Sequence, residues 1–154
     1  MIRILTLAAL FAAQAHTALA AQATGTLNVQ ATVLNTCSVS TAPVVFSNVG
    51  LSAATANGSV TITCTNSDPV SIALDGGGSG DIAARELSHD SLPTSFTYQL
   101  YSNPGLSTVW GDDVTGAAYS TSGPSQTLTV YGQTTSTPVA AGSYSDAVQV
   151  TVTY

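Results

Sequence analysis

The final ten residues of the sequence read SDAVQVTVTY (145–154) and alternate between polar and apolar side chains. This period of two is typical of a half-buried β-strand, because successive side chains of a strand point to opposite faces. The apolar face consists of residues at even positions, Val148, Val150, Val152 and Tyr154. The pattern predicts a strand that lies against a hydrophobic core.

A second alternating segment, TGTLNVQATVLNTC (24–37), lies near the front of the chain. Its apolar face consists of residues at odd positions, Leu27, Val29, Ala31 and Val33. A strand with such a face needs a partner to cover it. The pattern leaves open whether that partner belongs to the same chain or to another copy.

Short runs rich in Val, Thr, Ile and Tyr recur between these two segments, separated by Gly, Pro, Asn, Asp and Ser. We predict strands within 43–49, 58–65, 69–75, 95–102 and 127–133, with shorter pieces near Val109-Trp110 and Ala117 to Ser120. No segment from residue 21 onward has a useful helical period. This organisation predicts an all-β sandwich or barrel.

Residues 1–20 have the features of a secretory signal peptide. Arg3 precedes an apolar run from Ile4 to Ala13, and Ala18-Leu19-Ala20 suits signal peptidase. Cleavage after Ala23 is the alternative. The apolar run is too short for a membrane anchor, so we expect an exported protein without direct membrane insertion.

The charge balance limits the kinds of partner. The 154 residues carry a net charge of −6, with eight Asp and Glu against two Lys and Arg. Arg85 is the only basic side chain after residue 20, and Lys is absent. Nucleic acids and anionic membranes are therefore disfavoured as partners, since both require basic side chains.

The two cysteines, Cys37 and Cys64, are expected to form a disulfide in an exported protein. A loop of this size would stabilise the fold by roughly 3 to 4 kcal/mol. Two thiols without nearby histidines do not make a tetrahedral zinc site.

We find no pattern that predicts a catalytic, cofactor or metal site. His89 stands between Ser88 and Asp90, but consecutive residues do not converge as a catalytic triad requires. A calcium site is the alternative reading of four acids whose spacing matches no loop motif, Asp75, Asp81, Asp112 and Asp113.

Four aromatic residues suit either a sugar-binding platform or a sandwich core, namely Tyr98, Tyr101, Trp110 and Tyr119. Aromatic side chains of β-sandwiches more commonly belong to the core or its rim. A carbohydrate-binding or hydrolytic sandwich therefore stays a minor hypothesis.

Three blocks of the sequence resemble the spore coat protein U domain, the subunit type of archaic chaperone-usher pili. They are FTYQLYSNPGLSTVWGDD (96–113), LTVYGQ (128–133) and AGSYSDAVQVTVTY (141–154). The early Cys37 and the second cysteine in VTITCTN (60–66) also fit. The C-terminal block is the most specific of these features.

The resemblance implies an incomplete immunoglobulin-like β-sandwich that a donor strand from a neighbouring subunit completes. It divides the chain into a signal peptide (1–20), an N-terminal donor-strand extension (21–35) and a pilin sandwich domain (36–154). Leu27, Val29, Ala31 and Val33 would enter a neighbour's groove. The strand that carries Val148, Val150, Val152 and Tyr154 would flank this subunit's own acceptor groove and face a chaperone.

The implied function is that of a structural pilus subunit that polymerises by donor-strand exchange and supports adhesion and biofilm formation. Its implied partners are other pilus subunits, a periplasmic chaperone and an outer-membrane usher, and no enzyme activity or cofactor is expected. Assembly would begin in the periplasm and end in an extracellular fimbrium. The alternative is a free-standing secreted spore-coat or matrix protein of the same fold, whose N-terminal strand inserts into its own chain.

Overall fold

The computed structural model describes residues 21–47, 49–138 and 140–154, and the predicted signal peptide at 1–20 lies outside them. The chain divides into an N-terminal unit that ends at Thr32 and a larger unit from Val33 to Tyr154. Residues 21–32 are exposed and contain no helix or strand. Of the strand predicted within 24–37, no residue before Cys37 is in a strand in the single chain, since a strand needs a ladder partner.

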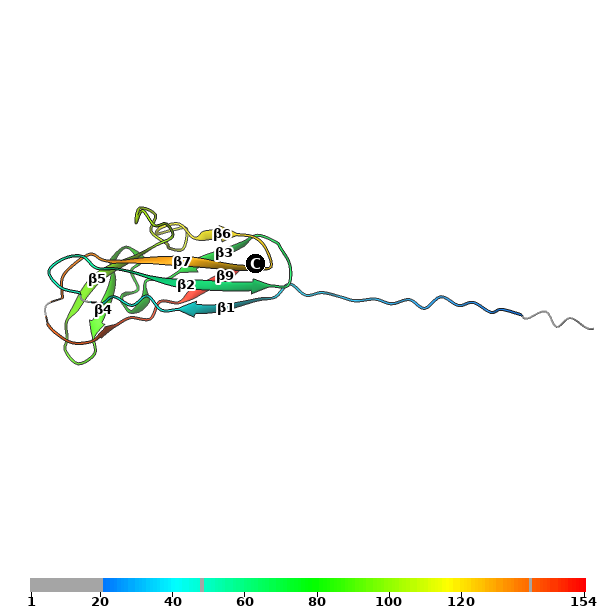
Figure 1. Cartoon of the computed structure of the whole chain (residues 1–154), viewed down its shortest axis with the longest axis horizontal. Helices are drawn as coiled ribbons and strands as arrows, with labels where there is room; N and C mark the ends of the chain where they lie inside the picture. The colour runs from blue at the N-terminus through cyan, green and yellow to red at the C-terminus, as the bar shows by residue number, and fades with distance from the viewer. Residues whose placement is uncertain (1–20, 48, 139) are drawn as a thin grey trace, which may run out of the picture. The chain divides into compact units, whose positions relative to one another are not determined.

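Two antiparallel sheets make up the larger unit (Figure 1). The first has the strand order β1-β2-β7-β5-β4-β8 and the second the order β6-β3-β9. The strands are β1 (Cys37–Ala42), β2 (Thr55–Cys64), β3 (Val70–Leu74), β4 (Arg85–His89), β5 (Ser95–Tyr101), β6 (Tyr119–Thr121), β7 (Ser125–Thr134), β8 (Tyr144–Ser145) and β9 (Val150–Thr153). Two short 3-10 turns, η1 (Gly77–Ser79) and η2 (Ile82–Ala84), lie between β3 and β4.

The core lies between the two sheets and is built from their inward-facing side chains. Its buried members come mainly from β2, β3, β5 and β7: Val60, Ile62, Cys64, Val70, Ile72, Leu74, Tyr98, Leu100, Trp110, Leu128 and Val130. Trp110 is 0% exposed, and its indole Nε1 donates a hydrogen bond of 2.8 Å to the Ile72 carbonyl. The all-β sandwich predicted from the strand pattern is confirmed.

The predicted strands at 58–65, 69–75, 95–102 and 127–133 correspond to β2, β3, β5 and β7. The prediction missed β1 and β4. Arg85 and Glu86 at the start of β4 break the apolar alternation that marks a strand.

The predicted strand at 43–49 is not formed, since the described residues of this range carry no strand assignment. The chain leaves β1 here and crosses over β2 and β7. A Cβ atom on Gly132 would lie only 2.6 Å from Val44 Cγ1 and 2.8 Å from Phe46 Cζ. Gly132 therefore gives these two side chains the room to pack against the sheet.

The C-terminal run forms two strands instead of the single strand that we predicted for 145–154. Its first part, β8, pairs with β4 in the larger sheet, whereas β9 pairs with β3 in the smaller sheet. The chain changes sheets at Asp146, whose carboxylate accepts hydrogen bonds from the N–H groups of Gly78 (2.7 Å) and Ala147 (2.8 Å). These hydrogen bonds keep the residues around Asp146 out of both the β8–β4 ladder and the β9–β3 ladder.

The predicted disulfide between Cys37 and Cys64 is present and joins the start of β1 to the end of β2. Tyr154 follows β9 at the same end of the sandwich, as Figure 1 shows for the C-terminus and the start of β1. We call this end the C-terminal pole and the other end the opposite pole.

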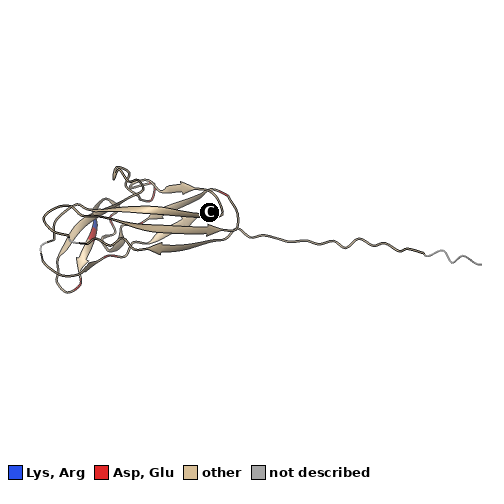
Figure 2. Cartoon of the chain, in the orientation of Figure 1, with Lys and Arg blue, Asp and Glu red and all other residues tan. Residues whose placement is uncertain are grey.

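The strands carry few charged side chains (Figure 2). Arg85 is nevertheless 0% exposed, and its guanidinium donates to the carbonyl groups of Leu74, Asp75 and Trp110 and to the Gln99 side chain. Burial lowers the pKa of Arg85, and nearby acidic groups oppose this effect. The bonds fasten the turn after β3 to the core.

Candidate functional site

An open apolar groove runs between two stretches of chain that lie far apart in the sequence. We call residues 41–47 and 49–51 the first rail, and residues 137, 138 and 140–150 the second rail. Two adjoining cavities of about 300 and 940 Å³ lie between the rails. The groove therefore exposes one side of the core.

The smaller of the two, which we call the β9 cavity, reaches directly into the core. It opens between Val44 on the first rail and Val148 and Val150 on the second rail. Its floor is made of buried core residues, among them Val60, Leu74, Tyr98, Leu100 and Val130. Such a lining suits an apolar side chain.

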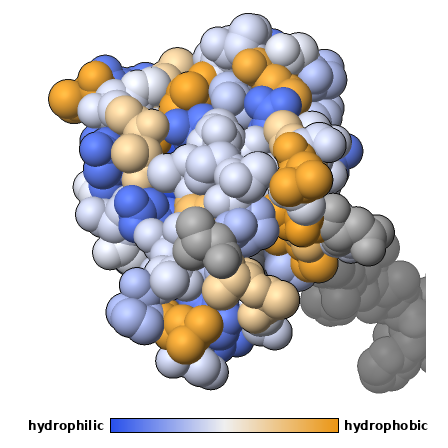
Figure 3. Space-filling view, turned by 90° about the vertical axis from the view of Figure 1, so that its left-hand side faces the viewer, coloured by the Kyte–Doolittle hydropathy of each residue, from blue (hydrophilic) through white to orange (hydrophobic). Residues whose placement is uncertain are grey.

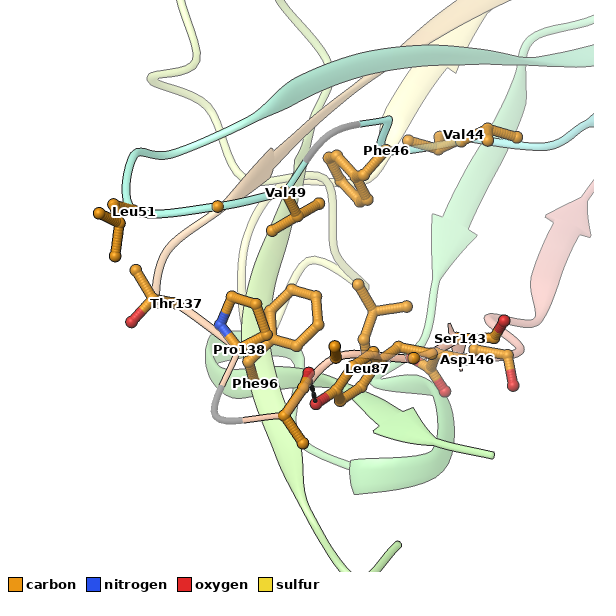
Figure 4. A pocket seen from close by; sticks show the side chains of 17 residues that line it. Val44, Phe46, Val49, Leu51, Leu87, Phe96, Thr137, Pro138, Ser143 and Asp146 are labelled. Atoms are coloured by element: carbon orange, nitrogen blue, oxygen red, sulfur yellow. Dashed lines mark hydrogen bonds between the residues drawn. The ribbon is translucent and has the colours of Figure 1, made fainter. Parts of the chain in front are cut away.

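The larger one, the β8 cavity, lies toward the opposite pole. Figure 4 shows Phe46 and Val49 on one side of it and Leu87 and Pro138 on the other. Phe96 and Tyr144 also line it and meet edge to face, with ring centroids 4.8 Å apart. This part of the groove is wide, and its lining combines apolar side chains with polar ones such as Thr137 and Ser143.

The two cavities meet at a boundary formed by the four residues that line both, Val44, Phe46, Leu87 and Asp146. Val44 and Phe46 reach this place from the first rail because Gly132 lies beneath them. Asp146 reaches it from the second rail. Among the described lining residues, Asp146 is the only one with a charged side chain.

The side chain of Asp146 is fixed by the floor of the groove. Tyr98 Oη donates a hydrogen bond of 2.6 Å to Asp146 Oδ2. Burial, followed by this bond and the charge of Asp146, raises the pKa of Tyr98 far above its usual value. Tyr98 therefore stays a neutral donor, and the carboxylate keeps its position.

The core is incompletely covered along both rails. Val39, just before the first rail, lies opposite the buried Ile62 of β2, yet it is 42% exposed. Val148, Val150 and Val152 pack against the core and are only half-buried. In the part of the chain that the structure describes, no backbone hydrogen bond joins residues 43–47 to residues 146–149. Residues 43–47 and 146–149 thus form no ladder with each other across the groove.

The residues predicted to flank an acceptor groove fall in three environments. Val148 and Val150 line the β9 cavity. Val152 packs against the core but lines neither cavity, and Tyr154 is 54% exposed at the C-terminal pole. Whether Val152 and Tyr154 take part in binding stays a prediction.

Sequence reasoning missed the first rail and the boundary residue Leu87. The apolar run at 43–49 was visible, but as a predicted strand it gave no indication that Val44 and Phe46 face the second rail. Leu87 belongs to β4, which the alternation pattern did not reveal.

The predicted donor residues are exposed in the single chain. Leu27 is 86% exposed, Val29 is 84% exposed and Val33 is 77% exposed. Ala31 is exposed as well. Their role as donors stays a prediction.

His89 is the last residue of β4 and has a structural role in the turn that follows. Its Nδ1 accepts hydrogen bonds from the N–H groups of Ser91 (3.0 Å) and Leu92 (3.1 Å), and its ring packs on Tyr144. An Nδ1 that already accepts two N–H groups is not free to act as a catalytic base.

Two of the four acidic residues considered as calcium ligands, Asp75 and Asp81, accept hydrogen bonds from backbone N–H groups in turns. Asp75 accepts N–H groups of Gly77 and Gln149, and Asp81 accepts that of Ala83. Within residues 21–47, 49–138 and 140–154, no group of three or more His, Cys, Asp or Glu is arranged to hold a metal ion.

The aromatic residues do not form a platform. Trp110 and Tyr98 belong to the buried core, and Tyr119 packs against Trp110 with ring centroids 5.4 Å apart. Trp110 and Tyr98 are therefore not exposed for stacking against a sugar.

The surface at the opposite pole carries hydrophobic residues in several separate clusters among polar ones (Figure 3). Leu51, which is 99% exposed, and Leu92, which is 47% exposed, are large apolar side chains outside the core.

Within the described residues, no helix is both long enough and apolar enough to cross a membrane.

Comparison with known families matches residues 23–151 to the sequence profile described as Spore Coat Protein U domain. The chain belongs to this family. The match spans both the alternating segment at 24–37 and most of the C-terminal run, so the resemblance seen in the sequence is confirmed. Among curated protein sequences, none matches this Spore Coat Protein U domain chain.

A solved structure has a similar fold. It is the CsuC-CsuE chaperone-tip adhesion subunit pre-assembly complex from archaic chaperone-usher Csu pili of Acinetobacter baumannii. One of its chains matches with a TM-score of 0.59 and 24% sequence identity, over 80% of the present chain and 41% of that chain. The present chain therefore spans less than half the length of its structural relative. The predicted class, an all-β immunoglobulin-like sandwich, is confirmed.

Proposed function

We propose that this Spore Coat Protein U domain protein is a structural subunit of a chaperone-usher pilus that polymerises by donor-strand exchange. The N-terminal extension of one copy, predicted at residues 21–35, would supply the strand that fills the groove of the next copy. This is β-augmentation, in which ladder hydrogen bonds supply affinity and alternate side chains supply fit.

The observation that carries the proposal is the unpaired gap between the two rails. It is open along residues whose side chains belong to the core, and the floor of the β9 cavity is apolar. The same sequence contains an alternating segment with an exposed apolar face at Leu27, Val29 and Val33. The groove has unpaired chain on both sides, and the alternating segment has no pairing partner in the single chain, so the two are complementary.

Magnitudes support this pairing. Burial of Leu27, Val29 and Val33 would contribute about 1.5 to 3 kcal/mol each. Each ladder hydrogen bond would add about 1 kcal/mol. The total is comparable with the stability of a small domain, which is about 5 to 15 kcal/mol.

The chain directions favour a donor that runs antiparallel to β9. The donor segment precedes β1, so it leaves its own sandwich at the C-terminal pole. A donor parallel to β9 would end at the C-terminal pole of the acceptor, where the acceptor's own donor also starts. An antiparallel donor ends at the opposite pole, so subunits join head to tail and form an open filament.

The further partners follow from the proposal. A periplasmic chaperone would cover the groove before polymerisation, because a bare apolar groove with unpaired strand edges invites aggregation. An outer-membrane usher would then exchange the chaperone for a donor. The chain would act in an extracellular fimbrium that supports adhesion and biofilm formation, with residues 1–20 as the export signal.

The test uses a charge on either face of the donor. Val29→Asp places a carboxylate in the apolar groove, whereas Gln30→Asp places it on the outer face of the same segment. Mature protein with Val29→Asp should lose the oligomers that resist SDS without heating, and the Gln30→Asp control should keep them.

Equal assembly of both variants would exclude the segment as donor. A wild-type chain that is stable and strictly monomeric at all concentrations would favour the alternative, a free-standing secreted protein whose N-terminal strand fills its own groove.

A further inference from the structure

We propose that the boundary at Asp146 sets a single register for the incoming donor, with Ala31 opposite Asp146. This inference rests on the proposed function and specifies how the groove selects its strand. In an antiparallel pair, directly opposite residues share one face of the sheet. The register then fixes four pairs: Leu27 with Val150, Val29 with Val148, Ala31 with Asp146, and Val33 with Tyr144.

The sizes of the donor side chains match the spaces that these pairs define. Leu27 and Val29 enter the β9 cavity, whose second rail carries Val148 and Val150. Ala31, the smallest of the four, meets the boundary that Val44, Phe46, Leu87 and Asp146 form between the cavities. Val33 then enters the β8 cavity beside Tyr144.

The boundary is rigid, so a larger side chain is not easily accommodated there. Asp146 is held by Tyr98 Oη at 2.6 Å, by the Gly78 N–H at 2.7 Å and by its neighbour's N–H at 2.8 Å. Phe46 is backed by the close approach to Gly132 and meets the Tyr98 ring edge to face at 6.2 Å. Both sides of the boundary are thus packed against the sandwich.

The neighbouring registers fit less well. A shift of two residues toward the C-terminal pole places the β-branched Val33 at Asp146 and Ala31 in the β9 cavity. A shift of two residues in the other direction places Val29 at Asp146 and leaves only Ala31 beside Tyr144. Either shift puts a larger side chain at the boundary and the smallest side chain in a cavity.

The hydrogen bonds at residues 34–36 support a donated strand that ends at Val33. The hydroxyl of Thr65 donates to the Leu34 carbonyl at 2.8 Å and accepts the Thr36 N–H at 3.1 Å. The Thr65 N–H also donates to the Thr36 carbonyl at 3.0 Å. Residues 34–36 are therefore held by their own sandwich, and Val33 is the last residue free to be donated.

Disulfide trapping between two full-length chains tests the register. One chain carries Gln30→Cys on the outer face of the donor, and the other carries a cysteine at an exposed position of the second rail. Ala147→Cys is the direct partner in the proposed register, and Ser145→Cys and Gln149→Cys are the partners in the shifted registers. Direct antiparallel pairs have Cα atoms within disulfide reach, whereas pairs displaced by two residues do not.

Equal mixtures are oxidised, and disulfide-linked peptides between isotopically labelled and unlabelled chains are quantified by mass spectrometry. We expect the Ala147→Cys chain to trap about tenfold more donor than either shifted partner, because only its sulfur atoms can meet without strain. A maximum at Ser145→Cys or Gln149→Cys would overturn the register and leave donor exchange intact. Links within single chains, or no oligomers in any mixture, would overturn the proposed function and the register with it.

Discussion

Gly132 illustrates how one residue shapes the groove. Its missing side chain lets Val44 and Phe46 lie on the sheet, since a Cβ atom there would come within 2.6 Å and 2.8 Å of them. The first rail depends on this close approach, and so does the boundary at Asp146.

Replacement of Gly132 by Val should displace Val44 and Phe46 into the groove. Overpacking of this kind costs about 1 to 3 kcal/mol. The expected result is a lower urea midpoint together with a loss of SDS-resistant oligomers. Thr129→Val on the exposed face of the same strand serves as the control and should change neither. Normal assembly of Gly132→Val would contradict the assigned position of the first rail.

At the residue scale, two of the predicted groove residues, Val148 and Val150, line the β9 cavity. Alternation identifies Val148 and Val150, because a period of two assigns side chains to faces. It does not identify Asp146, whose importance comes from three hydrogen bonds to distant or local groups. Nor does it identify Gly132, because the need for a glycine arises only when another segment crosses above it.

The disulfide is the element-scale feature with the clearest effect, because it ties β1 to β2 beside the root of the donor. Removal by Cys37→Ser with Cys64→Ser should cost about 3.5 kcal/mol on the loop-entropy model, given the sequence separation of 27 residues. Urea unfolding measures the change. The double variant Ser40→Ala with Thr61→Ala, on the same strand pair, is the control and should stay close to wild type. An unchanged urea midpoint of the cysteine variant would refute a stabilising role.

At the element scale, strands with regular alternation were predicted correctly, and those shaped by tertiary contacts were not. The pattern of β2, β3, β5 and β7 reflects burial on one face. In contrast, β4 begins with Arg85, which is buried only because carbonyl groups and Gln99 accept its hydrogen bonds. The division of the C-terminal run into β8 and β9 depends likewise on the loop that carries Gly78.

The whole molecule is expected to gain stability from its neighbours. If the groove is filled by another copy, the donor is a ligand for the folded state, and its concentration shifts the unfolding equilibrium. The apparent melting temperature of the mature chain should therefore rise with protein concentration. Calorimetry over a hundredfold concentration range measures this effect, which amounts to about 2.7 kcal/mol per site at a hundred times the dissociation constant.

The Val29→Asp variant provides the matched comparison. Its melting temperature should be lower and independent of concentration, since its donor no longer fits an apolar groove. A wild-type melting temperature that is equally independent of concentration would indicate a groove filled within the same chain.

At this largest scale, composition and alternation were sufficient for the all-β class, and the quoted blocks were sufficient for the family. The position of the groove was not predictable, because it results from the crossing of residues 43–47 over β7 and from the change of sheet at Asp146.

The buried Arg85 has a consequence for the resistance of the folded chain to proteases. It is the only Lys or Arg after residue 20, and it is 0% exposed. Proteases that cleave after Lys or Arg therefore find no accessible cleavage site after residue 20 of the folded chain. Reagents that react with lysine side chains find none to label. After residue 20, trypsin would cut once, between Arg85 and Glu86, and only in molecules that have already unfolded.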